Sequence, residues 1–286
     1  MKKLLFQLDT DPFPSAFDTV VAYDGGADHV TGYGNVTPQN VGLLVDGTIF
    51  TRAPKEKKYT AIFIGGSNMQ AGQELLKAVK KRFFANFRVS VMLDSNGSNT
   101  TAAAGVAMLT RSGSVAGKRA LVLAGTGPVG LRAAALLAKE GAQVAVTSRK
   151  RERAENACKQ IKERFGVSVS PIEAVDNAAR SAALAGAHIV FGAGAAGAQL
   201  LEELHWQSNP NVELMADANA TPPLGIAGVD MMDKAVNRYG KTVYGAIGFG
   251  GLKLQVHRAC IGKLFESENQ VFDAEEIYAM AKSMAQ

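Results

Sequence analysis

The stretch that decides the fold is RALVLAGTGPVGLRAAALLAKEGAQVAVTS, residues 119–148. It contains an apolar strand, a glycine-rich turn, an Ala- and Leu-rich helix and a second apolar strand, in that order. Gly125, Gly127 and Gly130 form a GxGxxG pattern that follows the first strand and opens the helix. In such a unit the first glycine permits the tight turn, the second lets the backbone approach a pyrophosphate, and the third lets helix and strand pack closely. The stretch therefore predicts a Rossmann-type dinucleotide-binding unit.

The turn of this unit is the predicted pyrophosphate site. A helix N-terminus offers free N–H groups and the positive end of the helix dipole to an anion. Pro128 suits the first helical position, since its missing N–H would have no partner inside the helix there. We therefore expect the cofactor to contact the whole turn, which comprises Gly125, Thr126, Gly127, Pro128, Val129 and Gly130.

The residues after the second strand favour NADP over NAD. Enzymes that select NAD place an Asp or Glu there, about 20 residues beyond the turn, to bind the ribose 2′-hydroxyl. This sequence instead has Ser148, Arg149, Lys150 and Arg151, and its first carboxylate is Glu152. A hydroxyl and cationic donors bind a 2′-phosphate through charge-assisted hydrogen bonds, whereas a carboxylate would repel it. The alternative is that the basic residues only form the solvated start of a helix, although that position favours acidic residues.

Two later loops are expected along the cofactor, because ligands collect beyond the carboxyl ends of parallel strands. One is GAGAAG, residues 192–197, and the other is DANATPPLG, residues 217–225. From these loops we predict contacts by Ala193, Asp217 and Asn219. A plain strand-to-helix turn explains any single glycine in the first loop equally well.

Short apolar runs alternate with helical periodicity along the chain, which is the pattern of an α/β protein with largely parallel sheets. The predicted strands are 4–8, 60–65, 88–93, 119–125, 143–148, 188–194 and 212–219, and the clearest helices are 73–84, 128–140 and 152–165.

The length of 286 residues suggests two domains, at roughly 150 residues each. One boundary is indicated by the Gly/Ser-rich turn RSGSVAGK, and the chain is expected to return to the first domain at the glycine cluster GFGG. We therefore expect an NADP-binding Rossmann domain at 114–248. A smaller α/β substrate domain is expected at 1–113, completed by the C-terminal helices of 249–286.

The composition excludes several classes of protein. With 47% hydrophobic and 20% charged residues the chain can bury a core, which excludes a disordered protein. No run approaches about 18 apolar residues and the start lacks a signal-peptide pattern, so we expect a cytoplasmic protein without a membrane span. Cys158 and Cys260 lack the spacing of a zinc site or disulfide framework. The net charge of +5 is not spread over a basic face with interleaved aromatics, which argues against nucleic acid.

Three loops of the N-terminal part, 9–18, 23–40 and 93–105, are rich in glycine and polar residues. The third follows a strand and opens a helix, so Asn96, Ser98, Asn99 and Thr100 could cap that helix, and capping is favoured for any one of them. Taken together, the loops concentrate hydrogen-bonding groups where we expect the substrate. The sequence has neither a Ser/His/Asp order nor an HExxH motif, which argues against a hydrolase or a metalloenzyme.

Four segments carry a resemblance to one enzyme family. They are YDGGADHVTGYGNVTPQNVG, MLDSNGSNTTAAAGVA, VLAGTGPVGLRAAALLA and GGLKLQVHRACIGKLFES. The chain resembles, over nearly its whole length, the NADP-dependent methylene-tetrahydromethanopterin dehydrogenase of methylotrophic bacteria. The resemblance implies reversible hydride transfer from methylene-tetrahydromethanopterin to NADP, giving the methenyl cation and NADPH, with methylene-tetrahydrofolate as a second candidate substrate. It also implies a homo-oligomer, expected to be a trimer, in formaldehyde oxidation or one-carbon assimilation.

This chemistry needs few catalytic groups. A carbon held between two nitrogens gives up hydride readily, because the nitrogen lone pairs stabilise the cation that forms. The enzyme mainly has to hold two rings within about 3 to 3.5 Å and to exclude water. Related folate dehydrogenase/cyclohydrolases hydrolyse the methenyl product with a Tyr-x-x-x-Lys arrangement, which the matching region here lacks. We therefore do not expect cyclohydrolase activity.

Lys253 is the basic residue that we predict nearest the pterin, since it follows the glycine cluster at the return to the first domain. A cation cannot favour the developing positive charge, so its predicted role is to position the substrate through hydrogen bonds. A helix-surface lysine is the alternative. Asp18, Asn96 and Thr100 are further predicted pterin contacts.

Two other functions stay open on the sequence. GNVTP, residues 34–38, is similar to the NVTxPxK motif of shikimate-type dehydrogenases, but Gln39 and Asn40 follow where that family has its lysine. A non-catalytic NADP-sensing protein would keep the glycine turn without needing polar loops in a second domain. Reduction of NADP with methylene-tetrahydromethanopterin or with shikimate separates these hypotheses.

Overall fold

The computed structural model describes residues 1–285, which form two compact units, each with its own parallel sheet. Unit 1 comprises Met1–Thr100 and Leu254–Met280. Unit 2 comprises Thr101–Lys253 and the residues from Ala281 onward. The predicted α/β class, with a Rossmann-type unit and a second α/β unit, is confirmed.

The boundaries between the units differ from those expected at 113 and 248. They lie at Thr100 and Lys253, because α4 (Ser98–Thr110) and α8 (Ala246–Lys263) each run from one unit into the other. The end of α9 (Ala274–Met284) also belongs to unit 2 and not to unit 1. The Gly/Ser-rich stretch 111–118 follows α4, within the residues of unit 2.

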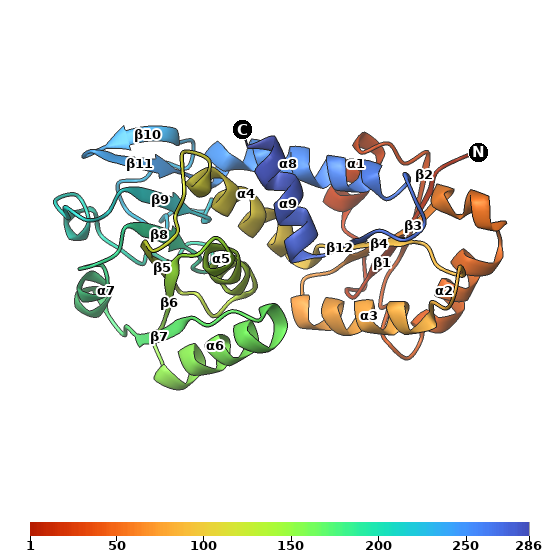
Figure 1. Cartoon of the computed structure of the whole chain (residues 1–286), viewed down its shortest axis with the longest axis horizontal. Coiled ribbons are helices and arrows are strands. Elements are labelled where there is room, and N and C mark those ends of the chain that lie inside the picture. Colours follow the sequence, from red (N-terminus) through yellow and green to blue (C-terminus); the bar gives the residue numbers. More distant parts are fainter. Residues whose placement is uncertain (286) are drawn as a thin grey trace. The chain divides into compact units, whose positions relative to one another are not determined.

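Unit 2 is built on a seven-stranded sheet of order β10-β11-β9-β8-β5-β6-β7 (Figure 1). All neighbours pair in parallel except β10, which is antiparallel to β11. Without β10, the order from β7 is the 3-2-1-4-5-6 of a doubly wound dinucleotide-binding fold. The strands are β5 (Arg119–Leu123), β6 (Gln143–Ser148), β7 (Ser170–Glu173), β8 (Ile189–Gly192), β9 (Leu214–Asp217), β10 (Lys234–Arg238) and β11 (Lys241–Tyr244).

Helices cover both faces of this sheet. In Figure 1, α5 (Pro128–Lys139) and α6 (Arg151–Phe165) lie on one side, and the short α7 (Asn177–Ala183) lies on the other. The buried side of α5 includes three consecutive alanines, 133–135, which let the helix approach the sheet closely. The opposite face is filled by a hydrophobic cluster that contains Leu121, Leu123, Val190, Trp206, Met215 and Val243.

Unit 1 contains a five-stranded, fully parallel sheet of order β12-β4-β3-β1-β2. Its strands are β1 (Leu4–Asp9), β2 (His29–Tyr33), β3 (Thr60–Gly65), β4 (Ser90–Leu93) and β12 (Val271–Phe272). Its helices α1 (Ala16–Asp24) and α3 (Met69–Arg82) lie on opposite sides of the sheet, and α2 (Val41–Phe50) packs on α3 (Figure 1). Three short 3₁₀ helices, η1 (Pro54–Tyr59), η2 (Ser95–Gly97) and η3 (Glu203–His205), complete the two units.

The central strands of unit 1 form its hydrophobic core. Every residue of β3 and β4 is buried, as expected of central parallel strands covered on both faces. One side packs against α2 and α3 through a cluster that includes Leu8, Val45, Ile62, Ile64, Leu75 and Val79. Within residues 1–285, none of the helices has the length and apolar character required to cross a bilayer.

Candidate functional site

The three glycines of the turn between β5 and α5 have different surroundings. A Cβ added at Gly125 would lie 2.9 Å from Cβ of Val146 in β6, and one at Gly130 would lie 2.7 Å from Cα of Gly125. A Cβ at Gly127 would meet no atom of the described chain within 4 Å. Two glycines are thus required by strand and helix packing, while the middle one leaves a bare backbone surface. This is the division of roles expected of a pyrophosphate-binding turn.

The start of α5 presents N–H groups beside that bare surface. Gly127 is the N-cap residue, and Pro128 occupies the first turn. The first helical hydrogen bond runs from the Leu131 N–H to the Gly127 carbonyl, at 2.9 Å. The N–H groups of Val129 and Gly130 precede that first helical donor, as is usual at a helix N-terminus. The structure therefore brings the predicted turn residues, including the half-buried Thr126, together at one helix start.

The cationic run lies at the end of β6, next to this turn. The hydroxyl of Ser148, which is 9% exposed, accepts a hydrogen bond from the Lys150 N–H at 3.3 Å. Arg149 and Lys150 are exposed, and Arg151 begins α6 with its guanidinium 2.7 Å from the Glu155 carboxylate. All three predicted phosphate-binding cations are thus exposed, and Arg151 also makes an ion pair within its own helix.

Thr147 fixes the glycine turn against the end of β6. Its hydroxyl accepts a hydrogen bond from the Ala124 N–H at 3.0 Å, and its carbonyl accepts one from the Gly125 N–H, also at 3.0 Å. Ala124 has a positive φ of 51°, an unusual conformation for a residue other than glycine. These bonds hold the turn and the residues that follow β6 in one fixed arrangement.

The side chains of Asp217 and Asn219 shape the loop after β9. The buried Asp217 carboxylate accepts hydrogen bonds from the N–H groups of Asn219 (3.1 Å) and Ile226 (2.9 Å). Burial raises the pKa of Asp217, and these backbone hydrogen bonds oppose that rise. Asn219 accepts a hydrogen bond from the Thr221 N–H at 2.9 Å and donates one to the Pro223 carbonyl at 3.2 Å. Their polar atoms are therefore engaged inside the loop.

The loop after β8 lies beside this one. The Ala193 N–H donates to the Leu123 carbonyl at 3.0 Å, so the predicted contact residue continues directly from the sheet. A Cβ at Gly192 would lie 2.9 Å from an oxygen of Asp217, which explains the glycine at this position without a ligand. Both loops are at the carboxyl ends of the strands, the edge at which doubly wound sheets bind nucleotides.

Two carboxylates that were not predicted from the sequence organise the loops of unit 1. Asp9, at the end of β1, accepts hydrogen bonds from the N–H groups of Asp11 (2.9 Å) and Ser15 (3.1 Å). Asp11 accepts two from Ser67, from its N–H at 2.9 Å and its hydroxyl at 3.0 Å. Burial raises the pKa of Asp9, and the backbone hydrogen bonds oppose that rise. An Asp-x-Asp directly after an apolar strand was the available signal.

Asp18 and Asn96, two of the predicted substrate contacts, lie at the loop end of the unit 1 sheet. Asp18 is in the first turn of α1, and a Cβ at Gly65 would lie 3.5 Å from its carboxylate. Asn96 is exposed, has a positive φ of 55°, and donates its N–H to the Gly66 carbonyl at 2.7 Å. Both therefore lie next to the end of β3, and their contact with substrate remains a prediction.

Thr100 has a different role from the one predicted. Its side chain is 0% exposed, and its hydroxyl donates to an Asp94 oxygen at 2.6 Å. Asp94 also accepts hydrogen bonds from the N–H groups of Asn99 (2.8 Å) and Thr100 (3.1 Å), so it caps the start of α4. A fully buried side chain with this partner cannot contact a substrate in this arrangement. The structure thus favours the capping interpretation and adds Asp94 as the acceptor.

Lys253 lies on α8, about two turns after the helix begins, and is half-buried. The glycines before it fall into two groups. A Cβ at Gly250 or Gly251 would meet no described atom within 4 Å. A Cβ at Gly245 or Gly248 would lie within 2.0 Å of a carbonyl oxygen of residues 230–233. The glycine-rich start of α8 therefore serves close backbone packing on one side and leaves bare surface on another.

Three matches with known proteins bear on the family to which this chain belongs. Residues 16–96 match the family profile described as "Methylene-tetrahydromethanopterin dehydrogenase, N-terminal". The chain is 62% identical over 286 residues to the bifunctional protein MdtA of Methylorubrum extorquens, with 99% of each chain covered. It is 33% identical over 294 residues to the NAD(P)-dependent methylenetetrahydromethanopterin dehydrogenase of the same organism, again with 99% of each covered.

Solved structures show a similar fold in more distant proteins. A shikimate 5-dehydrogenase from Mycobacterium fortuitum has a TM-score of 0.56 at 16% identity, with 98% of each chain covered. Quinate dehydrogenase from Corynebacterium glutamicum, in complex with NAD, has a TM-score of 0.53 at 14% identity, with 99% of each covered. At 14–16% identity these structures show a shared fold and not a shared function, so they do not favour the shikimate-type alternative. The two full-length relatives show that the chain belongs to the methylene-tetrahydromethanopterin dehydrogenase family.

Proposed function

We propose that this protein transfers hydride reversibly between the methylene carbon of methylene-tetrahydromethanopterin and NADP. The observation that carries the proposal is a bare glycine turn beside exposed cations, in a chain of this family. One carboxylate in place of Arg149 would have favoured NAD instead.

The residues of unit 2 fit an NADP molecule. The N–H groups at the start of α5 would hold the pyrophosphate over the bare backbone of Gly127. The Ser148 hydroxyl and the exposed Arg149 and Lys150 would bind the 2′-phosphate. Arg151 would contribute mainly through its charge while its guanidinium stays paired with Glu155. NADP supplies the hydride acceptor when bound, and the protein fixes the position of the cofactor.

The proposed pterin contacts are Lys253, Asp18 and Asn96. Lys253 would orient the pterin by donating hydrogen bonds, because a cation next to the reacting carbon would oppose the methenyl charge. The polar loops that Asp9 and Asp11 organise in unit 1 would hold the substrate in a fixed position. The protein thus acts by holding two rings at reacting distance and excluding water, which accounts for most of what this reaction needs.

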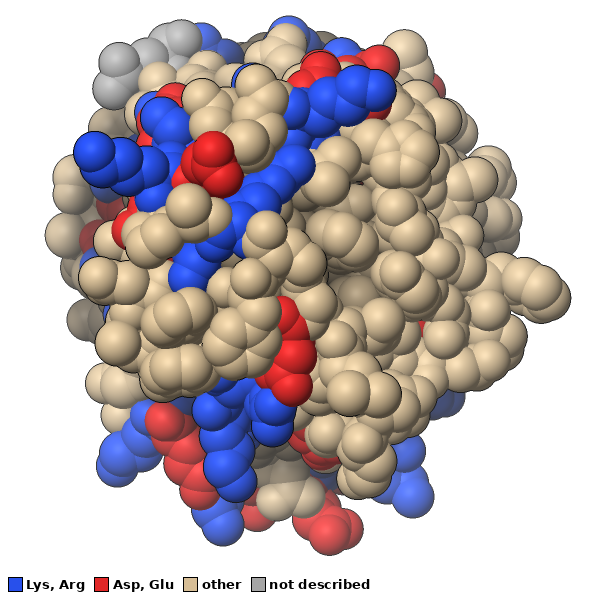
Figure 2. Space-filling model, turned by 90° about the vertical axis from the view of Figure 1, so that its right-hand side faces the viewer, with Lys and Arg blue, Asp and Glu red and all other residues tan. Residues whose placement is uncertain are grey.

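We also propose that the protein forms a homo-oligomer, with a trimer as the expected state. Unit 1 exposes large apolar side chains: Phe13 is 86% exposed, Leu43 86% and Phe50 57%. Figure 2, which views the molecule from the side of β2 and α2, shows a broad surface without Lys, Arg, Asp or Glu. Exposed apolar side chains of this size are typical of a surface that binds another protein. Light scattering after size-exclusion chromatography measures the mass and would refute assembly by giving a monomer.

The proposed reaction is tested with purified protein, NADP or NAD, and each of three substrates. We expect NADPH formation with methylene-tetrahydromethanopterin, and methylene-tetrahydrofolate is the second substrate to compare. Reduction of NADP with shikimate alone would establish the shikimate-type alternative. NADP binding without reduction by any substrate would favour a sensor protein. A clear preference for NAD would refute the role proposed for Arg149 and Lys150.

A further inference from the structure

The start of α8 is held by the loop that precedes β10. The first N–H groups of a helix lack partners inside the helix. Here the N–H groups of Ile247 and Gly248 both donate to the Met231 carbonyl, at 2.8 and 3.0 Å. The Gly245 N–H, one residue before the helix, donates to the Asp233 carbonyl at 2.8 Å. Backbone carbonyls of a distant loop thus replace the side-chain cap that usually begins a helix.

Two glycines permit this contact. A Cβ at Gly245 would lie 2.0 Å from the Asp230 carbonyl oxygen, and one at Gly248 would lie 1.7 Å from the Asp233 carbonyl oxygen. No side chain fits at either position without moving the loop backbone. The place where α8 begins is therefore determined by the place of residues 230–233.

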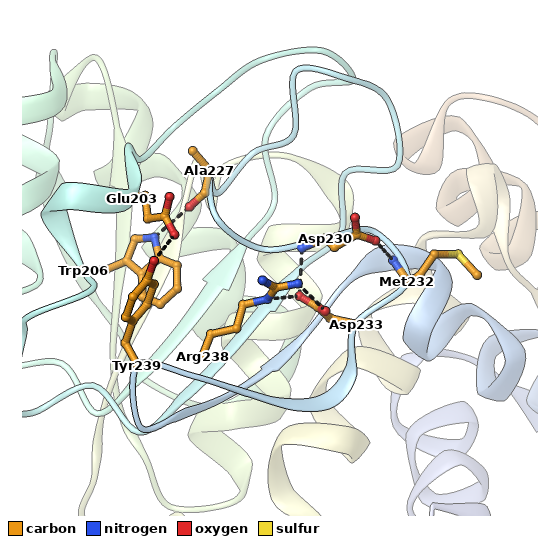
Figure 3. A network of polar contacts seen from close by, with 8 residues as sticks. All are labelled: Glu203, Trp206, Ala227, Asp230, Met232, Asp233, Arg238 and Tyr239. Carbon is orange, nitrogen blue, oxygen red and sulfur yellow. Dashed lines mark hydrogen bonds and ion pairs between the residues drawn. The ribbon is translucent and has the colours of Figure 1, made fainter.

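An ion pair between Arg238 and Asp233, shown in Figure 3, holds this loop together with several hydrogen bonds. The Arg238 guanidinium, from β10, donates to both oxygens of the Asp233 carboxylate, from Nε at 2.6 Å and from Nη2 at 2.8 Å. The Asp233 side chain is 5% exposed and also accepts the Asp230 N–H at 2.8 Å. The Asp230 carboxylate accepts the Met232 N–H at 2.8 Å. A two-pronged contact of this kind fixes direction as well as distance.

The other end of the loop is anchored separately. The indole N–H of the fully buried Trp206 donates to the Ala227 carbonyl at 2.9 Å (Figure 3). The Tyr239 hydroxyl donates to the Glu203 carboxylate at 2.7 Å, next to the same indole. The Arg238–Asp233 pair, by contrast, holds the segment whose Met231 and Asp233 carbonyls accept hydrogen bonds from the start of α8.

We propose that Arg238 and Asp233 are positioning residues for the substrate, acting through the start of α8 on Lys253. This inference rests on the proposed function, in which Lys253 orients the pterin. Lys253 lies on the same helix, about two turns after its start, so we expect a shift of the loop to displace its side chain.

The glycine turn and the cationic run proposed for NADP follow β5 and β6, which do not neighbour β10 in the sheet. The predicted cofactor contacts Asp217 and Asn219 begin the same connection as residues 230–233, but their side chains bond to Ile226 and Thr221. We therefore expect NADP binding to be unaffected by a shift of residues 230–233.

The test uses Arg238→Lys, which keeps the charge but cannot donate two fixed, parallel hydrogen bonds. We expect the KM for methylene-tetrahydromethanopterin to rise about tenfold, which is less than the roughly 100-fold cost of a 1 Å misplacement. The dissociation constant of NADPH should stay unchanged, and amide exchange at Ile247 and Gly248 should accelerate. Arg82→Lys is the control, since Arg82 makes a two-pronged but more exposed pair with Asp46 in unit 1. This substitution should leave the KM unchanged.

A double-mutant cycle separates positioning from general destabilisation. If Arg238 acts through Lys253, Arg238→Lys will have no further effect on the pterin KM in a Lys253→Met background. Additive effects, an unchanged KM in Arg238→Lys, or an equal loss of NADPH affinity would overturn the inference. Failure of the wild-type protein to oxidise methylene-tetrahydromethanopterin would instead overturn the proposed function, so the two failures are distinguishable.

Discussion

Alanine substitutions at Gly127 and Gly130 should separate cofactor binding from folding. Both glycines belong to the same turn, yet a Cβ meets open space at Gly127 and the Gly125 Cα, 2.7 Å away, at Gly130. Gly127→Ala should therefore weaken the binding of NADP, and Gly130→Ala should lower the stability of the folded protein. This contrast tests whether the bare surface at the start of α5 is a ligand surface.

The expected stability of Gly127→Ala follows from its backbone. Gly127 has φ −84° and ψ 170°, an extended conformation that alanine adopts without strain. Alanine has fewer backbone conformations than glycine in the unfolded chain, which stabilises the folded variant by roughly 0.4–1 kcal/mol. Alanine is, however, a poorer N-cap than glycine, which costs a similar amount. We expect a free energy of unfolding within about 1 kcal/mol of the wild type.

The expected stability of Gly130→Ala follows from its contacts. Ordinary contact begins at 3.4 Å, so the new methyl group must move the turn by 0.7 Å, the difference between 3.4 and 2.7 Å. Overpacking of this kind costs roughly 1–3 kcal/mol. At about 2–4 °C per kcal/mol the melting temperature should fall measurably.

NADPH titration by fluorescence and urea unfolding measure the two quantities on the same preparations. Gly127→Ala should weaken NADPH binding at least tenfold, or about 1.4 kcal/mol, because its methyl group takes the space proposed for the pyrophosphate. Wild-type affinity in a normally folded Gly127→Ala protein would refute the assignment of this turn to the cofactor.

Three further predictions follow from exposure and burial. Replacing Arg149 and Lys150 by Ala together should weaken NADPH binding about 10- to 100-fold and leave NADH binding unchanged, measured by parallel titrations; an equal loss for both would argue against a 2′-phosphate site. Thr100→Val should destabilise the protein by about 1–3 kcal/mol in urea unfolding, because a buried Asp94 oxygen loses its hydroxyl partner, with the pterin KM unchanged; a raised KM would restore a substrate role. Burial raises the pKa of the Cys260 thiol to about 12, so the thiolate is scarce at pH 8. Iodoacetamide should modify Cys260 only after unfolding, and rapid modification of the native protein, detected by mass spectrometry, would contradict this.

The central strands could be predicted from sequence, and the edge strands could not. The predicted strands 60–65 and 143–148 agree in full with β3 and β6, since buried parallel strands are continuous apolar runs. By contrast, β7 contains a proline and β10 is mostly exposed, so neither shows such a run. Edge strands pair on one side only and tolerate polar residues, which leaves no comparable pattern.

The candidate site divides in the same way. The glycine turn was predictable because its glycines serve needs within a short stretch of sequence: close packing at Gly125 and Gly130, and a bare backbone at Gly127. Asp94 and Asp233 were not, because their partners are backbone N–H groups or side chains whose approach depends on the folded chain. Thr100 illustrates a pattern with two interpretations. A polar residue after a strand suits both a substrate contact and a helix cap, and its burial, which the sequence does not give, decides between them.

The division of unit 1 between two stretches of sequence affects how the protein is made. Residues Leu254–Met280 supply its edge strand β12, which pairs with β4 nearly 180 residues earlier in the chain. During synthesis on a ribosome, the main segment of unit 2, Thr101–Lys253, is complete before this strand emerges. The N-terminal unit must therefore wait with an open sheet edge, a state prone to wrong pairing. In this protein, the first domain to be translated cannot complete its sheet until the main segment of the second domain has been made.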